Sequence, residues 1–284
     1  MTLDPGRAGA DRRQLAAALR DLRSASGLSG ERLARRCHMS QSKISRIENG
    51  RTLPSITDVE RILHALGADR DTGEELVRLA RTANTEYQDV RASVRQGLHH
   101  RQRELAGLDA DARRLSFFLP ALISGLLQTP AYMKRAMDMA VEPAQGDTAR
   151  AIALKLERQA VLHDASKAFD FLLTEQAVRW RLCPPETMCE QIDRIIALSR
   201  LDNVRIGVVH PGRDVEVGPM NTFTVYDDRL VTVEIFTGRV VLRDPKDIAY
   251  HRRLFAYFER HALWGDDARA LLADFSREFM RERD

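Results

Sequence analysis

A short helical stretch with little apolar surface constrains this chain most. Residues 39–51 read MSQSKISRIENGR, in which Ile44 and Ile47 stand three positions apart and nearly all their neighbours are polar or basic. In a helix, that spacing gives one narrow apolar edge and leaves most of the surface exposed. The exposed surface faces either water, as on an ordinary surface helix, or the groove of a DNA duplex.

The flanking sequence makes this stretch the third of five short helices. Apolar residues at helical spacing predict them over 11–26, 30–38, 41–49, about 56–66 and from about 72 onward. Serines stand at three N-cap positions and glycines at two helix ends; the caps are Ser29, Ser40 and Ser55, and the stops are Gly27 and Gly50. The sequence therefore predicts a compact all-α domain over 1–85.

Positive charge is concentrated in the first part of this domain. Residues 7–51 hold eleven Lys and Arg against four Asp and Glu, a net charge of +7. Residues 52–90 hold four against eight, a net charge of −4. A basic cluster on one small module is typical of phosphate binding, although a solvated basic face has the same composition.

The side chains of the third helix suit DNA better than water alone. A recognition helix in the major groove needs a narrow apolar back, here Ile44 and Ile47 packed on Leu33 and Ala34, and a polar front. Gln can bind adenine through two hydrogen bonds, and Arg or Lys can bind guanine. The predicted front consists of Gln41, Ser42, Lys43, Ser45, Arg46 and Asn49.

The remainder of the chain has a different pattern. Residues 86–114 are strongly charged with weak apolar periodicity, which predicts an exposed helix or linker. Apolar residues then predict a loop and a helix capped by Thr129, a strand over 168–174, and four short strands between 203 and 244. Further helices are expected over 148–164, 184–201, 245–262 and 266–282. We therefore expect an α+β domain over 115–284 with a small, mostly antiparallel sheet.

Several classes of protein fit the sequence poorly. The chain has no apolar run long enough for a membrane span and no secretory signal at its N-terminus, and three scattered cysteines make no disulfide framework or zinc pattern. We expect a cytoplasmic, nucleoid-associated protein without a metal or cofactor. No nucleophile–base pair or phosphate loop is evident, so we expect no enzyme; Glu175 and Glu234 are the carboxylates whose burial would bear on this.

Motifs over 11–80 resemble the Xre/Cro-type helix-turn-helix of phage repressors and bacterial regulators. They include Leu-Ala, Ser-Gln-Ser, Ile-Ser-Arg-Ile-Glu, Gly-Arg and a closing Leu-Gly. The resemblance implies that Gln41, Ser42, Lys43 and Arg46 contact bases, that Ser40, Asn49 and Arg51 contact phosphates, and that Arg23 pairs with Glu48. Two positions depart from the pattern: Gly30 replaces a common Gln, and His38 replaces a turn glycine.

Segments over 115–280, above all Leu-Gln-Thr-Pro-Ala-Tyr at 127–132, resemble the actinobacterial domain of unknown function that often follows such modules. That resemblance implies a small partner protein encoded nearby, and for some relatives an antitoxin-like role. Three functions stay open: a transcription regulator that senses a ligand or binds a partner, an antitoxin-like protein that represses its own promoter, and a DNA-tethered enzyme.

Two expectations concern assembly. One short recognition helix gives too little contact for a specific genomic site, which predicts a homodimer on a palindromic operator of double-stranded DNA. The apolar segment 118–133 forms either the core of the second domain or an exposed groove for a small protein.

Overall fold

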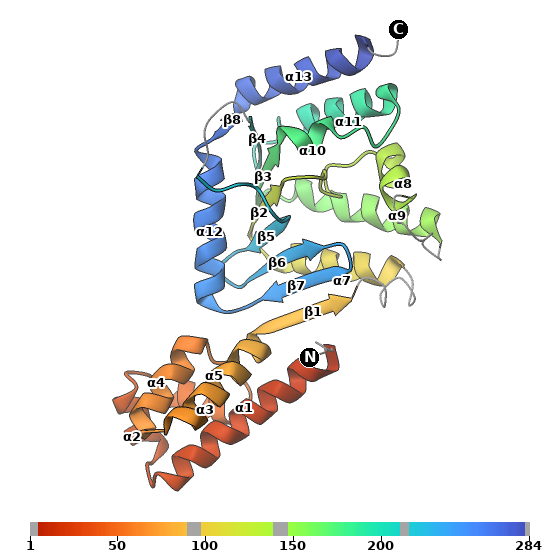
Figure 1. The fold of residues 1–284 in the computed structure, drawn as a ribbon. Helices are drawn as coiled ribbons and strands as arrows, with labels where there is room; N and C mark the ends of the chain where they lie inside the picture. The colour runs from red at the N-terminus through yellow and green to blue at the C-terminus, as the bar shows by residue number, and fades with distance from the viewer. Residues whose placement is uncertain (1–4, 90–97, 139–146, 211–215, 282–284) are drawn as a thin grey trace. The chain divides into compact units, whose positions relative to one another are not determined.

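The computed structural model describes residues 5–89, 98–138, 147–210 and 216–281, which form two compact units (Figure 1). The first unit consists of Met1–Gln88 with Val240–Ile248, and the second of Asp89–Arg239 with Ala249–Asp284. The domain limits expected from the sequence, 1–85, 86–114 and 115–284, stay predictions. Within the described ranges, no helix is both long and apolar enough to cross a membrane.

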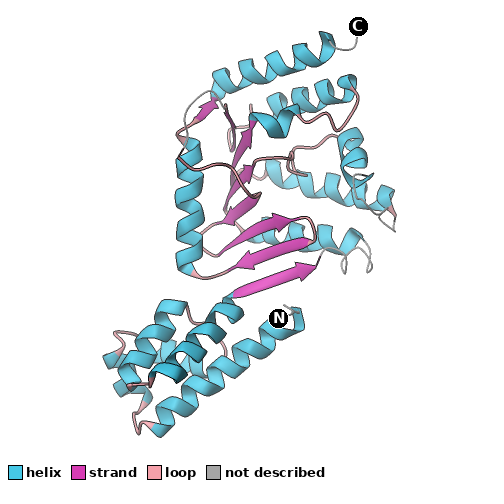
Figure 2. Ribbon diagram, viewed as in Figure 1, coloured by secondary structure: helices cyan, strands magenta, loops and turns pink. Residues whose placement is uncertain are grey.

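The first unit is built from the five expected helices (Figure 2). They are α1 (Pro5–Ala25), α2 (Gly30–Arg36), α3 (Gln41–Glu48), α4 (Ile56–Leu66) and α5 (Arg70–Asn84), followed by strand β1 (Thr85–Asp89). One side chain or more from every helix enters a common core, which includes Leu15, Leu33, Ile44, Ile62 and Leu76. This confirms the all-α helix-turn-helix fold.

Local capping chemistry fixes where these helices start and stop. Ser29, Ser40 and Ser55 each accept a hydrogen bond from the backbone N–H three residues on, as predicted. Gly27 has a φ of 66°, in the left-handed region that glycine enters without strain. His38, at the turn where similar domains carry glycine, has a φ of 54°. The turn is therefore made with some strain, which histidine tolerates better than a β-branched residue.

The first unit also contains a segment from late in the chain. Asp244 is 1% exposed, and its Oδ2 accepts the N–H of Ile56, the first residue of α4, at 2.8 Å. Its Oδ1 accepts the N–H of Lys246 at 2.9 Å, so the same carboxylate also caps helix α12 (Pro245–Glu259). The N–H of Arg243 donates to the carbonyl of Asn84 at 3.0 Å. Residues 240–248 are thus an integral part of the helix-turn-helix unit.

The strands form one mixed sheet in the order β1-β7-β6-β5-β2-β3-β4-β8. Strand β2 is parallel to β3 and β3 to β4, while the pairs β2–β5, β5–β6 and β4–β8 are antiparallel. The strands after β1 are β2 (Arg114–Leu119), β3 (Ala168–Thr174), β4 (Val204–Val209), β5 (Phe223–Tyr226), β6 (Leu230–Ile235), β7 (Gly238–Leu242) and β8 (Ala262–Trp264). The second part of the chain is therefore α+β, as expected, with a parallel centre between antiparallel flanks.

Helices cover both faces of this sheet in the second unit (Figure 1). On one face the ring of Phe118 stacks on Phe258 of α12, and on the other Phe117 stacks on Phe171 of β3. The remaining helices are α7 (Leu98–Asp111), α8 (Pro130–Asp138), α9 (Thr148–Gln159), η1 (a 3₁₀ turn, Ala160–His163), α10 (Glu175–Arg179), α11 (Pro185–Leu198) and α13 (Gly265–Arg281). Cover on both faces explains why nearly every residue of β3 is buried.

Two sequence expectations need correction here. The apolar run that starts at Phe118 was expected to be a loop, but its first two residues end the central strand β2, which pairs with β3 and β5. For segment 118–133 the core alternative holds at Ile123, Leu126 and Leu127, which are at most 2% exposed, whereas Leu122 is 41% exposed. The buried part of this segment gives no support for a partner. Of the expected linker 86–114, residues 90–97 lie outside the described residues, and α7 occupies most of the rest.

Candidate nucleic-acid interface

Helix α3 presents a narrow apolar back and a wide polar front. Ile44 and Ile47 are 1% and 0% exposed, and both belong to one core with Leu33 and Ala34 of α2. Because residues three apart share a helix face, this packing turns the positions between and beside them outward. The short eight-residue helix is therefore fixed by its back while its front stays accessible.

The first turn of α3 combines an N-cap with two exposed polar side chains. The Oγ of Ser40 accepts the N–H of Lys43 at 3.2 Å and lies 3.1 Å from the hydroxyl of Ser42. Gln41 and Ser42 are exposed. Their side chains can turn toward a ligand, and the positive end of the helix dipole favours a phosphate at this end.

Two arginines, one on the front of α3 and one just after the helix, have no internal partner in the described part of the chain. Arg46 and Arg51 are exposed, and neither side chain has a hydrogen bond or an ion pair within the described residues. Asn49 instead donates from Nδ2 to the carbonyl of Ser45 at 2.8 Å, and Ser45 is half-buried. Two guanidinium groups are thus available for bases or phosphates. Ser45 and Asn49, in contrast, already use part of their hydrogen-bonding capacity on each other.

Lys43 has a partner that sequence reasoning missed. Its Nζ lies 2.7 Å from Oδ1 of Asp58, which is 8% exposed and sits at the third position of α4. The other oxygen of Asp58 accepts the N–H of Ser55, whose hydroxyl in turn accepts the N–H of Asp58. This reciprocal capping box holds the carboxylate in place. The Ser-x-x-Asp pattern at 55–58 was a usable signal for the box, but not for the lysine.

The ion pair between Arg23 and Glu48 is confirmed. Nε of Arg23 lies 2.6 Å from Oε1 of Glu48, and Nη2 lies 3.1 Å from Oε2, a two-point contact between α1 and α3. The hydrogen bond to Glu48 raises the pKa of Arg23. The contact neutralises a carboxylate that would otherwise repel phosphates near the recognition helix.

Outside this unit, the two carboxylates whose burial the sequence analysis singled out are Glu175 and Glu234. Glu175 at the end of β3 accepts Nη1 of Arg179 at 2.9 Å and lies 2.5 Å from Nδ1 of His210. Glu234 is half-buried in β6. Within the described residues, no three His, Cys, Asp or Glu side chains are grouped as metal ligands would be.

The fold of the first unit and the exposed front of α3 define a helix-turn-helix DNA-binding protein. A model of the helix-turn-helix domain matches residues 14–76. The chain belongs to the family described as Domain of unknown function (DUF5753), whose model matches residues 102–274. This order confirms the organisation that the two sequence resemblances implied.

Comparisons with individual proteins add little. No curated protein matches the chain. One similar solved structure is that of TrmBL2, an archaeal chromatin protein with a reported novel mode of DNA binding. The likeness covers 72% of this chain and 65% of that one, less than two thirds, at 12% identity and a TM-score of 0.33. Similarity this low carries no argument about function.

Proposed function

We propose that this protein is a sequence-specific transcription regulator. Its helix-turn-helix unit binds operator DNA, and its second unit senses a small ligand or a partner protein. The observation that carries the proposal is the accessible front of α3, on which Arg46 has no partner among the described residues while Ile44 and Ile47 anchor the back; Arg51, just after the helix, has none either. Base contacts are assigned to Gln41, Ser42, Lys43 and Arg46, and phosphate contacts to Ser40, Asn49 and Arg51.

Lys43 has a conditional role in this proposal. Its ammonium is bound to Asp58 in the free protein, so contact with a base or phosphate requires exchange of one partner for another. The lysine stem is long and flexible enough for that exchange. The free energy that Lys43 gains from contact with DNA is therefore reduced by the cost of breaking its ion pair with Asp58.

The proposal includes a homodimer on a palindromic operator. One eight-residue recognition helix supplies few base contacts, and two copies related by a two-fold axis would bind half-sites about 10 base pairs apart or a multiple of that. Sedimentation of the full chain with and without operator DNA tests this. A monomer in both conditions would contradict it.

The direct test compares two arginine variants on DNA selected by the protein from genomic fragments. Arg46→Ala should weaken the best site by about 1–3 kcal/mol and relax preference at one base pair. Arg51→Ala should weaken specific and random DNA alike, and lower the salt dependence by about one ion. Arg78→Ala, an exposed arginine on α5, is the matched control. If all three variants bind alike at moderate salt, α3 does not enter the groove.

An antitoxin-like role is the alternative. It predicts a small protein, encoded beside this chain, that co-purifies with it in a fixed ratio. With most apolar side chains of segment 118–133 buried in the core, this alternative rests on family resemblance alone.

A further inference from the structure

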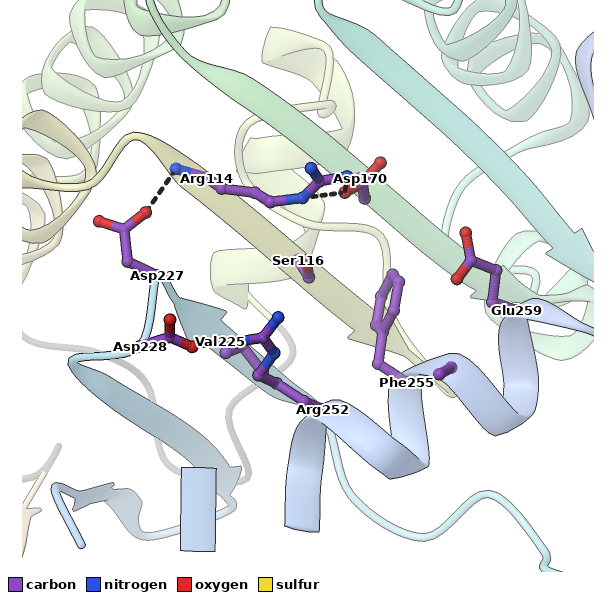
Figure 3. Close-up of a pocket in the computed structure, with 10 residues that line it drawn as sticks. Arg114, Ser116, Asp170, Val225, Asp227, Asp228, Arg252, Phe255 and Glu259 are labelled. Carbon is purple, nitrogen blue, oxygen red and sulfur yellow. Dashed lines mark hydrogen bonds and ion pairs between the residues drawn. The ribbon is translucent and has the colours of Figure 1, made fainter. Parts of the chain in front are cut away.

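A cavity of about 360 Å³ lies within the second unit, between the sheet and helix α12 (Figure 3). Strands β2, β3 and β5 supply Ser116, Asp170 and Val225, and α12 supplies Arg252, Phe255 and Glu259. A volume of this size is at the lower end of sites that hold small molecules. None of the contacts proposed for DNA involves these residues.

Two arginines that line this cavity, Arg114 and Arg252, have guanidinium N–H groups that are not used in hydrogen bonds to the described part of the protein. Arg114 donates from Nε and Nη2 to Oδ2 of Asp170, a carboxylate that is 3% exposed and also accepts Nη1 of Arg205. Nη1 of Arg114 has no bond within the described residues. Arg252 pairs through Nη1 with Asp228, which leaves its other nitrogens free. In Figure 3 the Arg114 side chain extends toward Asp170 and the Arg252 guanidinium lies near Asp228 and Ser116, and both arginines line the same cavity as the Ser116 hydroxyl.

The arginine end also holds Asp170, Asp227 and Asp228, each of which already accepts bonds from neighbouring protein groups, and the far end holds Glu259. Glu259 accepts Nη2 of Arg205 through Oε1 at 3.1 Å, and its Oε2 has no bond within the described part of the chain. Phe255 and Val225 provide apolar surface between the two ends. Across the whole lining there are four carboxylates and two arginines. A simple anion would meet an excess of negative charge, and a simple cation would meet the two arginines.

We infer that this cavity binds a small zwitterion, an apolar α-amino acid or a dipeptide of the same kind. The ligand carboxylate meets Arg114, Arg252 and the hydroxyl of Ser116. Its ammonium group meets Glu259, and its side chain lies against Phe255. Such a ligand is neutral overall, its carboxylate can accept from the unused N–H groups of the arginines, and its ammonium group can donate to the unused oxygen of Glu259.

Helix α12 connects this site with regulation, a step that rests on the proposed function. The helix starts at the cap made by Asp244, whose other oxygen holds the first N–H of α4. It continues through the residues that line the cavity. The same helix thus carries both the turn capped by Asp244 and the lining of the cavity, and α4, which shares that cap, carries the carboxylate bound to Lys43.

The test measures binding to the full chain without DNA, so that its outcome is independent of operator recognition. The probes for isothermal titration are L-leucine, L-phenylalanine and L-leucyl-L-leucine at millimolar concentration. Two analogues of leucine each retain a single charge, 4-methylpentanoate and 3-methylbutylamine. At least one zwitterion should bind, and both single-charge analogues should bind at least about tenfold more weakly, because each lacks one charged hydrogen-bonding group.

Variants then locate the site. Arg252→Gln should weaken the zwitterion at least about tenfold, and Ser116→Ala should weaken it less. Arg253→Gln is the matched control, because adjacent helical residues point about 100° apart and Arg253 does not line the cavity. The inference is overturned if no zwitterion binds, if a single-charge analogue binds equally well, or if the two glutamine variants bind alike. Failure of DNA binding would instead count against the proposed function.

Discussion

Replacement of Asp244 by alanine tests whether the late segment stabilises the helix-turn-helix unit. The side chain is 1% exposed, and its two oxygens accept the N–H of Ile56 at 2.8 Å and of Lys246 at 2.9 Å. Alanine leaves both helix starts without these acceptors. Loss of one N-cap typically costs about 0.5–2 kcal/mol. For the α4 contact, we expect about 2 kcal/mol, because the Ile56 amide is left partly buried without a partner.

Hydrogen exchange measured peptide by peptide is the suitable assay. Both tryptophans, Trp180 and Trp264, lie in the second unit and would not monitor α4. A loss of about 2 kcal/mol increases the population of the open form roughly 30-fold, so peptides from 56–66 should exchange about that much faster. Asp244→Asn retains one acceptor oxygen and should fall between alanine and the natural protein.

Asp71→Ala provides the control. Asp71 is exposed in the first turn of α5, and its side chain has no hydrogen bond within the described residues. Its replacement should leave exchange in 56–66 nearly unchanged. Equal exchange of this peptide in Asp244→Ala and in the natural protein would refute the reasoning. A fragment that ends at residue 88 lacks the cap altogether and should show the same fast exchange in α4.

Three further predictions concern the second unit and the buried thiols. Gly207→Ala would place a Cβ 2.7 Å from the ring of Trp264, so we expect a loss of about 1–3 kcal/mol and altered tryptophan fluorescence; unchanged fluorescence and stability would contradict this packing. Burial raises the pKa of Tyr226 to about 12. Between pH 10 and 12 the unfolded chain loses this proton and the folded chain keeps it, so stability should fall by about 1.4 kcal/mol per pH unit, and Tyr226→Phe should reduce that slope in urea titrations. All three cysteines are buried and free, so a thiol reagent should react with them only as fast as the protein opens.

Local chemistry made the first unit predictable from the sequence. Serine caps, glycine stops and apolar residues at helical spacing act within a few residues, so Ser40 and Gly27 could be assigned their places directly. The pair between Arg23 and Glu48 was found only through family resemblance, because two charged residues 25 positions apart carry no local signal.

Contacts between distant segments could not be predicted in this way. Asp244 and Ile56 are 188 positions apart, and nothing near either residue indicates the other. Strand β2 was missed because a short apolar run has the same composition in a buried strand as in a buried loop. The same ambiguity left the burial of Leu126 open until the structure placed it in the core. The cavity beside α12 is built from side chains of four separate elements, so no single sequence motif predicts it.

The first unit is built from two segments that are far apart in the sequence, and this affects how it folds during synthesis. Domains generally fold as units while the ribosome makes them, the N-terminal one first. Here residues 1–88 leave the ribosome long before residues 240–248 have been translated, yet both belong to one unit. The nascent helix-turn-helix therefore waits for the cap from Asp244, and prematurely terminated chains never receive it. Helix-turn-helix units that carry this cap are thus restricted to molecules that also contain most of the second unit.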